Sequence, residues 1–402
     1  MERAVYELLW DTRSPFDGLY LQVPGRVVVR YDAEALETAS VAIVSDSYQL
    51  LELFSAQINN HVSSLVILPG QVVPPSEGNH SVLNITASSP DFITSGALYA
   101  EITLNKPVRH ISTKAQTIVL PGALQTTDVN ANLTLHAYVN GEIFYNDVNA
   151  ISLNKLKLGA FDAGTVQLTV PSLTLETTLE LDAGDNAHII IVANDTKASL
   201  IDSSVEDNAA IYLESTNSLY AKILKSDAED AGKITYYPQG SCLSSSVDAD
   251  GRSQVNIGSI ICENTTVYAS DSSSVVVQST NTLKATTDDQ STISYFNTTP
   301  QELPKTEAPE VKHAFRYTGP NLHFIKNNSY TVAIPIEIPP LEPVWVDVFP
   351  QGNNMLPGKS QFNVATESPV LFGCVVAIFA AFLVLLAILL KRLTRGKYQR
   401  LQ

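Results

Sequence analysis

The chain has 402 residues, of which 45% are hydrophobic and 16% charged, and its net charge is −16. This length suits two or three ordinary domains or one long repetitive domain, with ample apolar material for a core. The acidic balance argues against nucleic acid as a partner, because neutralising phosphates needs clustered Lys and Arg.

Cysteine and histidine are too few and too scattered to indicate a cofactor. There is no CxxC, HExxH or paired Cys/His spacing, so we expect neither a metal nor a redox group. We expect the histidines at surface or strand positions: His61, His80, His110, His136, His188, His313 and His323.

Residues 1–14 lack the features of a signal peptide. The start has no basic region followed by an apolar stretch, and the short run AVYELLW contains Glu7. Since the C-terminal features described below indicate a secreted orientation, we expect that a signal peptide is missing from this sequence.

Residues 15–130 are predicted to be an N-terminal β region. The segments GLYLQV, RVVVRYD, SVAIVS and SLVILPG alternate in polarity as strands do. We expect them to form either the first coils of a stack or a cap that protects its end from edge pairing.

Residues 131–297 are repetitive. Strands are expected to start at spacings of 23, 23, 22, 23, 21, 20 and 18 residues, at Ile143, Val166, Ile189, Ile211, Ile234, Val255, Val275 and Ile293. Each unit combines a turn, a short β-branched strand and a second strand, and one unit cannot bury its apolar face alone. Stacked at about 4.8 Å per coil, such units share one core. The repeat therefore predicts an all-β fold, a parallel β-solenoid.

Aspartates mark the turns of this repeat, four residues before most strand starts: Asp162, Asp185, Asp207, Asp230, Asp271 and Asp289. Asp suits a turn because its side chain caps nearby backbone. Calcium binding and catalysis are the alternatives. The nine-residue Gly-Asp repeat of calcium-binding rolls is missing, and the one adjacent pair, Asp288–Asp289, would point to opposite faces of a strand.

Several strings resemble a known family. They are FDGLYLQVPGRVVVRYD near the start, the turn DSSSVVV, and a final strand that ends near Tyr295 and Pro300. Together they resemble the auto-transporter adhesin, head GIN domain, family over roughly residues 15–300. This chain has Asp-Ser or Asp-Asn where that family often has Gly-Ser-Gly. The resemblance implies a β-solenoid with an adhesive surface role, and it carries no catalytic residues.

Cys242 and Cys262 lie at nearly the same phase of adjacent coils, eight and seven residues after their strand starts. Stacked positions approach within disulfide reach, and an outer compartment is oxidising. A disulfide and two free thiols both fit this spacing. Cys374, the third cysteine, falls in the apolar run described next.

The C-terminal part predicts a stalk, a membrane span and a tail. Prolines are frequent in residues 298–369, which we expect to be a stalk that lifts the solenoid off the membrane. Residues 370–390 contain no charge and are long enough to cross a bilayer as one transmembrane helix. The basic tail, residues 391–402, marks the cytosolic side. We therefore expect a single-pass type I protein in the plasma membrane or an endomembrane.

Two further motifs agree with this topology. Acceptor sequons for N-glycosylation all precede the span, at Asn79, Asn84, Asn132, Asn194, Asn264, Asn297 and Asn327. In the tail, Tyr398 to Leu401 match the Y-x-x-apolar sorting pattern that clathrin adaptors bind as an extended strand.

The sequence therefore favours a cell-surface glycoprotein that is not an enzyme and serves adhesion or structural binding of an extracellular protein or glycan. A carbohydrate-active β-helix enzyme is one alternative, because glycosidic cleavage needs only two carboxylates in a groove. A receptor that cycles through endosomes is the other, and it rests on Tyr398 and Leu401.

Overall fold

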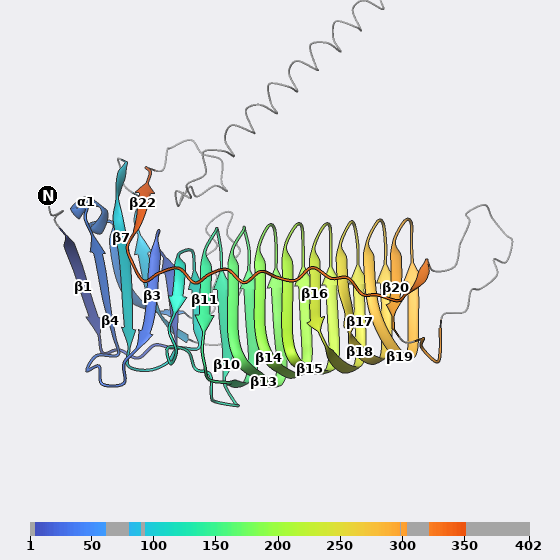
Figure 1. Ribbon diagram of the computed structural model, residues 1–402. Helices are drawn as coiled ribbons and strands as arrows, with labels where there is room; N and C mark the ends of the chain where they lie inside the picture. The colour runs from blue at the N-terminus through green and yellow to red at the C-terminus, as the bar shows by residue number, and fades with distance from the viewer. Residues whose placement is uncertain (1–4, 62–79, 90–92, 298, 304–320, 351–402) are drawn as a thin grey trace, which may run out of the picture. The chain divides into compact units, whose positions relative to one another are not determined.

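The computed structural model describes residues 5–61, 80–89, 93–297, 299–303 and 321–350. These residues form a stack of β-coils with antiparallel strands at its N-terminal end (Figure 1). The predicted all-β parallel solenoid is confirmed. Among the described residues no helix has the length and apolar character that a bilayer requires. The predicted span 370–390 and tail 391–402 lie outside this part of the chain.

The regular coils pair in parallel from one to the next. Their strands are β8 (His110–Thr113), β9 (Gln116–Val119), β10 (Asn132–Ala137), β11 (Glu142–Asn146), β12 (Ile151–Ala160), β13 (Thr165–Ala183), β14 (His188–Val205), β15 (Ala210–Ala228), β16 (Lys233–Pro238), β17 (Gly240–Ala249), β18 (Gln254–Ala269), β19 (Ser274–Thr287), β20 (Thr292–Phe296) and β21 (Leu322–Ile325).

Each full coil has three sides. In β14 the alternation of buried and exposed residues is interrupted at 194–195 and again at 199–200. Pairing with β15 resumes after each interruption, so residues 188–193, 195–198 and 200–205 form the first, second and third sides. A four-residue turn then leads into the first side of the next coil.

The core is built from rows of identical positions. The expected strand starts, from Ile143 and Val166 through to Ile293, pair in one continuous parallel register, and all of them are buried. This inward row thus stacks one β-branched side chain on another, which removes apolar surface from water along the whole stack.

The N-terminal region contains both of the expected arrangements. Parallel pairs of β2 with β8 and of β3 with β9 continue the coils, while antiparallel pairs of β1 with β4, β4 with β7 and β5 with β6 close the end. The elements are β1 (Tyr6–Thr12), β2 (Gly18–Gln22), β3 (Arg26–Tyr31), β4 (Ala39–Ser45), α1 (Tyr48–Leu51), β5 (Phe54–His61), β6 (His80–Ala87) and β7 (Thr94–Leu104).

Residues 321–350 form a strap, drawn in orange, that runs back along the first side of the coils (Figure 1). It starts at β21, beside β20, and ends at β22 (Val344–Val348), which pairs antiparallel with β7 at the other end of the stack. The structure therefore differs from the stalk expected for residues 298–369, because the described part of that segment lies on the solenoid.

Side chains of the coils hold the strap in place. The Gln167 amide donates to the Ile336 carbonyl at 2.9 Å and accepts from the Ile336 N–H at 2.7 Å. Tyr330 stacks on Tyr237, and the Tyr237 hydroxyl accepts from the Ala333 N–H at 2.9 Å. Since these partners repeat along one side, the strap covers that side and leaves the other two exposed.

Candidate functional site

The turns between coils stack into a column, which we call the turn column. It runs from residues 138–141 to 288–291. In each turn the N–H of the fourth residue donates to the carbonyl of the first, as between Gly232 and Glu229 at 2.9 Å. The second residue has a positive φ, from 50° at Asp289 to 68° at Gly251. Asp adopts this left-handed conformation more readily than most residues.

All six predicted aspartates occupy that second position: Asp162, Asp185, Asp207, Asp230, Asp271 and Asp289. Val139 and Gly251 take it in the two turns that have no aspartate at this position. The aspartate carbonyls also link the coils, since the Asn208 N–H donates to the Asp185 carbonyl at 2.7 Å. These aspartates therefore shape the turns and keep them in register.

Further acids make the turn column strongly negative. Glu229 stands at the first position of its turn, and Asp227 lies just before it on the third side. Slight burial raises the pKa of Glu229, and the negative charges of Asp227 and Glu206 raise it further. A hydrogen bond with Asp250 raises the pKa of Asp271, while the same bond lowers the pKa of Asp250.

These carboxylates do not assemble a metal centre. Among the described residues, no group of three or more His, Cys, Asp or Glu side chains is placed to hold a metal ion. Asp288 and Asp289 share one turn, where the Asp288 carboxylate accepts from the Asp289 N–H at 2.9 Å. The hydrogen bond between the two residues therefore stabilises the turn in which they lie.

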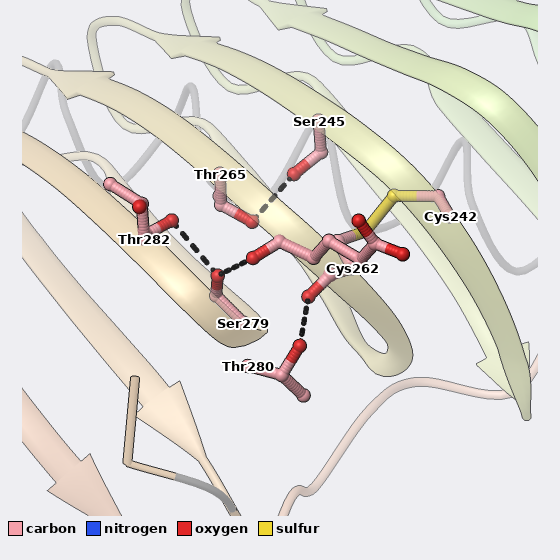
Figure 2. The surroundings of a disulfide bond; sticks show 8 residues. Cys242, Ser245, Cys262, Thr265, Ser279, Thr280 and Thr282 are labelled. Carbon is pink, nitrogen blue, oxygen red and sulfur yellow. Dashed lines mark hydrogen bonds between the residues drawn. A yellow bond between two sulfur atoms is a disulfide. The ribbon is translucent and has the colours of Figure 1, made fainter. Parts of the chain in front are cut away.

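Cys242 and Cys262 form a disulfide inside the core (Figure 2). Both are buried, they are direct partners in adjacent coils, and their Cα atoms are 4.4 Å apart. A buried Ser245–Thr265 hydrogen bond of 2.9 Å runs beside them, and the Ser279 hydroxyl follows in the next coil. Adjacent coils are thus joined covalently on the second side and by a hydroxyl pair on the third side, near the corner between the two sides.

The sequon asparagines lie mainly at exposed positions. Asn132, Asn194, Asn264, Asn297 and Asn327 are exposed, Asn84 is half-buried, and Asn79 lies outside the described residues. Three of them accept a hydrogen bond from the next coil through Oδ1, at 2.9 Å from Asn154, 3.1 Å from Thr216 and 2.9 Å from Asn281. A glycan is attached through Nδ2, so these bonds leave the attachment atom available.

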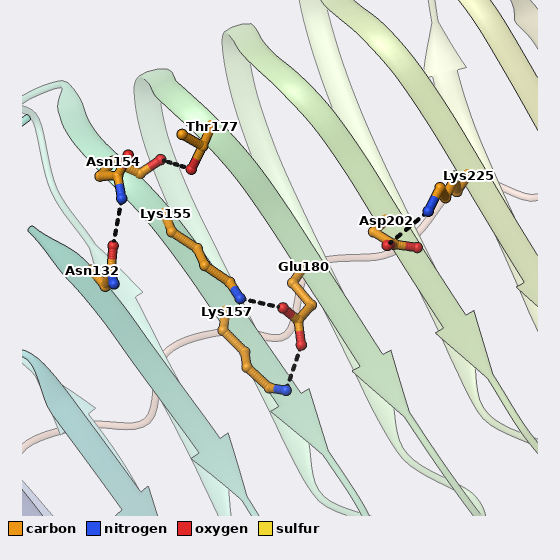
Figure 3. Close-up of polar contacts among 8 residues, drawn as sticks. All are labelled: Asn132, Asn154, Lys155, Lys157, Thr177, Glu180, Asp202 and Lys225. Atoms are coloured by element: carbon orange, nitrogen blue, oxygen red, sulfur yellow. Dashed lines mark hydrogen bonds and ion pairs between the residues drawn. The ribbon is translucent and has the colours of Figure 1, made fainter. Parts of the chain in front are cut away.

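The exposed third side carries a charged row that crosses the coils, which we call the outer row. Glu180 accepts from Lys155 at 2.6 Å and from Lys157 at 2.5 Å, and Lys225 lies 3.9 Å from Asp202 (Figure 3). Burial raises the pKa of Glu180, but the two lysines outweigh it and hold that pKa low. The outer row comprises Lys157, Glu180, Asp202, Lys225, Ser246, Thr266 and Lys284.

A buried histidine is the feature that the sequence did not reveal. His136 is 4% exposed, and its Nδ1 lies 3.0 Å from the Tyr138 hydroxyl. Its ring meets His110 edge to face, and the opposite residue in the next coil is Gly159, where a Cβ would come within 2.5 Å of the imidazole. Burial, assisted by His110 and Lys157, lowers the pKa of His136 to about 3.

Tyr398 and Leu401, the expected sorting motif, lie outside the described residues, so the motif stays a prediction.

Comparisons with known proteins show similar folds only among solved structures. No family model matches the chain, and no curated protein does. The resemblance to the GIN domain family therefore stays a prediction.

Three solved structures illustrate the likeness. A candidate adhesin from Parabacteroides merdae is 13% identical, with a TM-score of 0.38, over 72% of this chain and 95% of that one. One from Bacteroides fragilis is 13% identical, with a TM-score of 0.37, over 63% and 97%. A third, from Parabacteroides distasonis, is 11% identical, with a TM-score of 0.37, over 80% and 96%. We argue the function below from this chain's own residues.

Proposed function

We propose that this chain is an adhesin-like, GIN-domain-type glycoprotein of the cell surface whose solenoid binds other extracellular molecules and catalyses no reaction. The observation that carries the proposal is the outer row. It repeats charged and hydroxyl side chains along an exposed side, from Lys157 to Lys284, at each coil. Recognition by such a surface is spread over many coils, as solenoids bind through extended faces.

The placement of the chain outside the cytosol is part of the proposal. A buried disulfide between Cys242 and Cys262 suits an oxidising compartment. The exposed sequons suit passage through the secretory pathway. The apolar run 370–390 with its basic tail provides a single type I anchor in the plasma membrane or an endomembrane.

The contacts of the carboxylates favour an adhesive role over a carbohydrate-active enzyme. Asp288 caps its own turn, Asp250 bonds Asp271, and Glu180 is paired with two lysines. Each of these acids is engaged within its own turn or with the neighbouring coil. Glycosidic cleavage needs instead two carboxylates that face a shared groove.

The test uses the full chain, expressed behind a cleavable signal peptide with an N-terminal epitope tag. We expect the tag to be stained on intact cells and glycosidase treatment to reduce the apparent mass. Expressing cells should adhere to at least one of a panel of coated matrix proteins and glycans more strongly than mock-transfected cells.

A matched pair of variants locates the surface. Ser246→Arg places a cation on the outer row, and we expect adhesion to fall. Ser274→Arg makes the same change at an exposed serine on the first side, and adhesion should persist. Equal loss in both variants, or no adhesion by the wild type at normal surface expression, would contradict the proposal.

A further inference from the structure

Strand β1 is the outermost strand of its sheet at the N-terminal end of the stack (Figure 1). In the described part of the chain it pairs with β4 alone, antiparallel from Tyr6–Ser45 to Thr12–Ala39. Its second edge therefore presents backbone N–H and C=O groups that can pair with another strand. Of the devices that usually block such an edge, β1 has no proline, lysine or bulge, and its two charges, Glu7 and Asp11, are both acidic.

The same strand carries a cluster of exposed apolar side chains. Val5 is 68% exposed, Tyr6 40%, Leu8 37% and Leu9 61%, and Tyr48 lies against Tyr6 with ring centroids 5.8 Å apart. By strand alternation Tyr6 and Leu8 lie on one face of β1 and Leu9 on the other, so both faces of this edge strand expose apolar surface.

An apolar cavity of about 140 Å³ opens between β1, β4 and β5. Leu8 and Trp10 line it from β1, Val41 and Ile43 from β4, and Phe54 from β5. Leu8 and Trp10 pair with Ile43 and Val41, whose side chains face the core, so the cavity is the open end of the core. A void of this size accepts a group as large as benzene.

The charged side chains of β1 determine which strand can pair with its second edge. Glu7 and Asp11 are exposed and flank Leu9 on the outward face of β1. Arg13, the next cation along the chain, already pairs with Glu37 at 2.8 Å. A second copy of this chain would bring another Glu7 and Asp11 to the same seam, and like charges facing or neighbouring each other across strands are unfavourable.

We propose that the β1 edge binds an extended segment of a partner protein by strand addition, with the pattern basic–apolar–apolar–apolar–basic. Antiparallel to β1, the basic residues face Asp11 and Glu7. The central apolar residue meets Leu9, and its two neighbours extend the core over Trp10 and Leu8 into the cavity. Backbone pairing supplies affinity in such complexes, and alternate side chains supply specificity.

This site lies apart from the outer row, so the proposal does not rest on the adhesive function, and either can fail alone. The experiment titrates the purified full chain against fluorescent peptides and measures anisotropy. The probes are SGKVIVKGS and its acid-flanked counterpart SGEVIVEGS. We expect the basic peptide to bind more tightly, by on the order of tenfold, because two cross-strand charge pairs change sign.

Two double variants complete the test. Glu7→Lys with Asp11→Lys should reverse the preference, while Glu206→Lys with Glu229→Lys, the same charge change in the turn column, should preserve it. Circular dichroism checks that both variants fold. Equal affinity of the wild type for the two peptides would overturn the proposal. So would a wild-type dimer, seen by light scattering, that binds neither peptide, because a second copy would then occupy the edge.

Discussion

His136 should make the stability of the solenoid sensitive to mild acid. The pKa of its imidazole falls from an ordinary 6.5 in the unfolded chain to about 3 in the folded one. At pH 5 the unfolded imidazole is almost fully protonated and the folded one is neutral. The unfolded state then binds the extra proton, so unfolding becomes easier as pH falls through 6.5 and continues to do so toward about 3.

The magnitude follows from the unfolded pKa alone as long as the folded value stays well below 5. Between pH 7.5 and pH 5 the lost stability is about 2 kcal/mol, since each unit below 6.5 contributes about 1.4 kcal/mol. The assay is urea unfolding of the purified chain, followed by circular dichroism at both pH values, for wild type and His136→Gln. The wild type should lose about 2 kcal/mol more than the variant.

Comparing the two pH profiles removes other effects. The lowered pKa of His188 and the raised pKa values of Glu229 and Asp271 are common to both proteins. Any constant cost of losing the Tyr138 contact cancels as well. Parallel profiles for wild type and His136→Gln would refute the reasoning, because they would mean that His136 titrates alike in the folded and unfolded chains.

Four other outcomes are expected. Cys242→Ala with Cys262→Ala should cost about 3 kcal/mol of unfolding free energy, because the disulfide closes a loop with a sequence separation of 20, and reductant should not affect the variant further. Asp207→Gly should leave the melting temperature nearly unchanged, whereas Asp207→Val should cost about 1 kcal/mol, because its backbone is left-handed; equal effects would contradict this. Gln167→Ala should speed amide hydrogen exchange at Ile336, since that N–H loses its acceptor, while exchange at Ala333 stays unchanged. Tyr398→Ala should slow internalisation of the full chain from the cell surface, and an unchanged uptake rate would rule out the sorting motif.

The solenoid could be predicted because its determinants are local and periodic. Ile189, Ile211 and Ile234 recur once per coil, and the parallel register places them in one row. The aspartates could be assigned to turns because they too recur once per coil. The structure adds that their backbone is left-handed, with a φ of 57° at Asp207, and this conformation is the main reason for aspartate at these positions. Cys242 and Cys262 could likewise be predicted to be neighbours, because they occupy nearly the same position in adjacent coils.

The strap could not be predicted because its contacts are not periodic. Prolines between residues 298 and 369 indicate an extended chain but do not indicate the surface on which it lies. The bond between Gln167 and Ile336 joins positions 169 apart in the sequence, and no repeat specifies it. The burial of His136 was missed for a related reason, because it depends on the ring of Tyr138, which meets the imidazole edge to face and is itself stacked on Phe161 of the next turn.

The strap also decides how the solenoid would respond to a pulling force. Tension applied at residue 350 reaches the folded chain first through β22, which pairs with β7 at the N-terminal end. Load between this point and an object held at the β1 edge would cross only β4 and β7, since β1 pairs with β4 and β4 with β7. The coils from β13 to β20 would then stand aside from the loaded path, so their number would not limit mechanical strength.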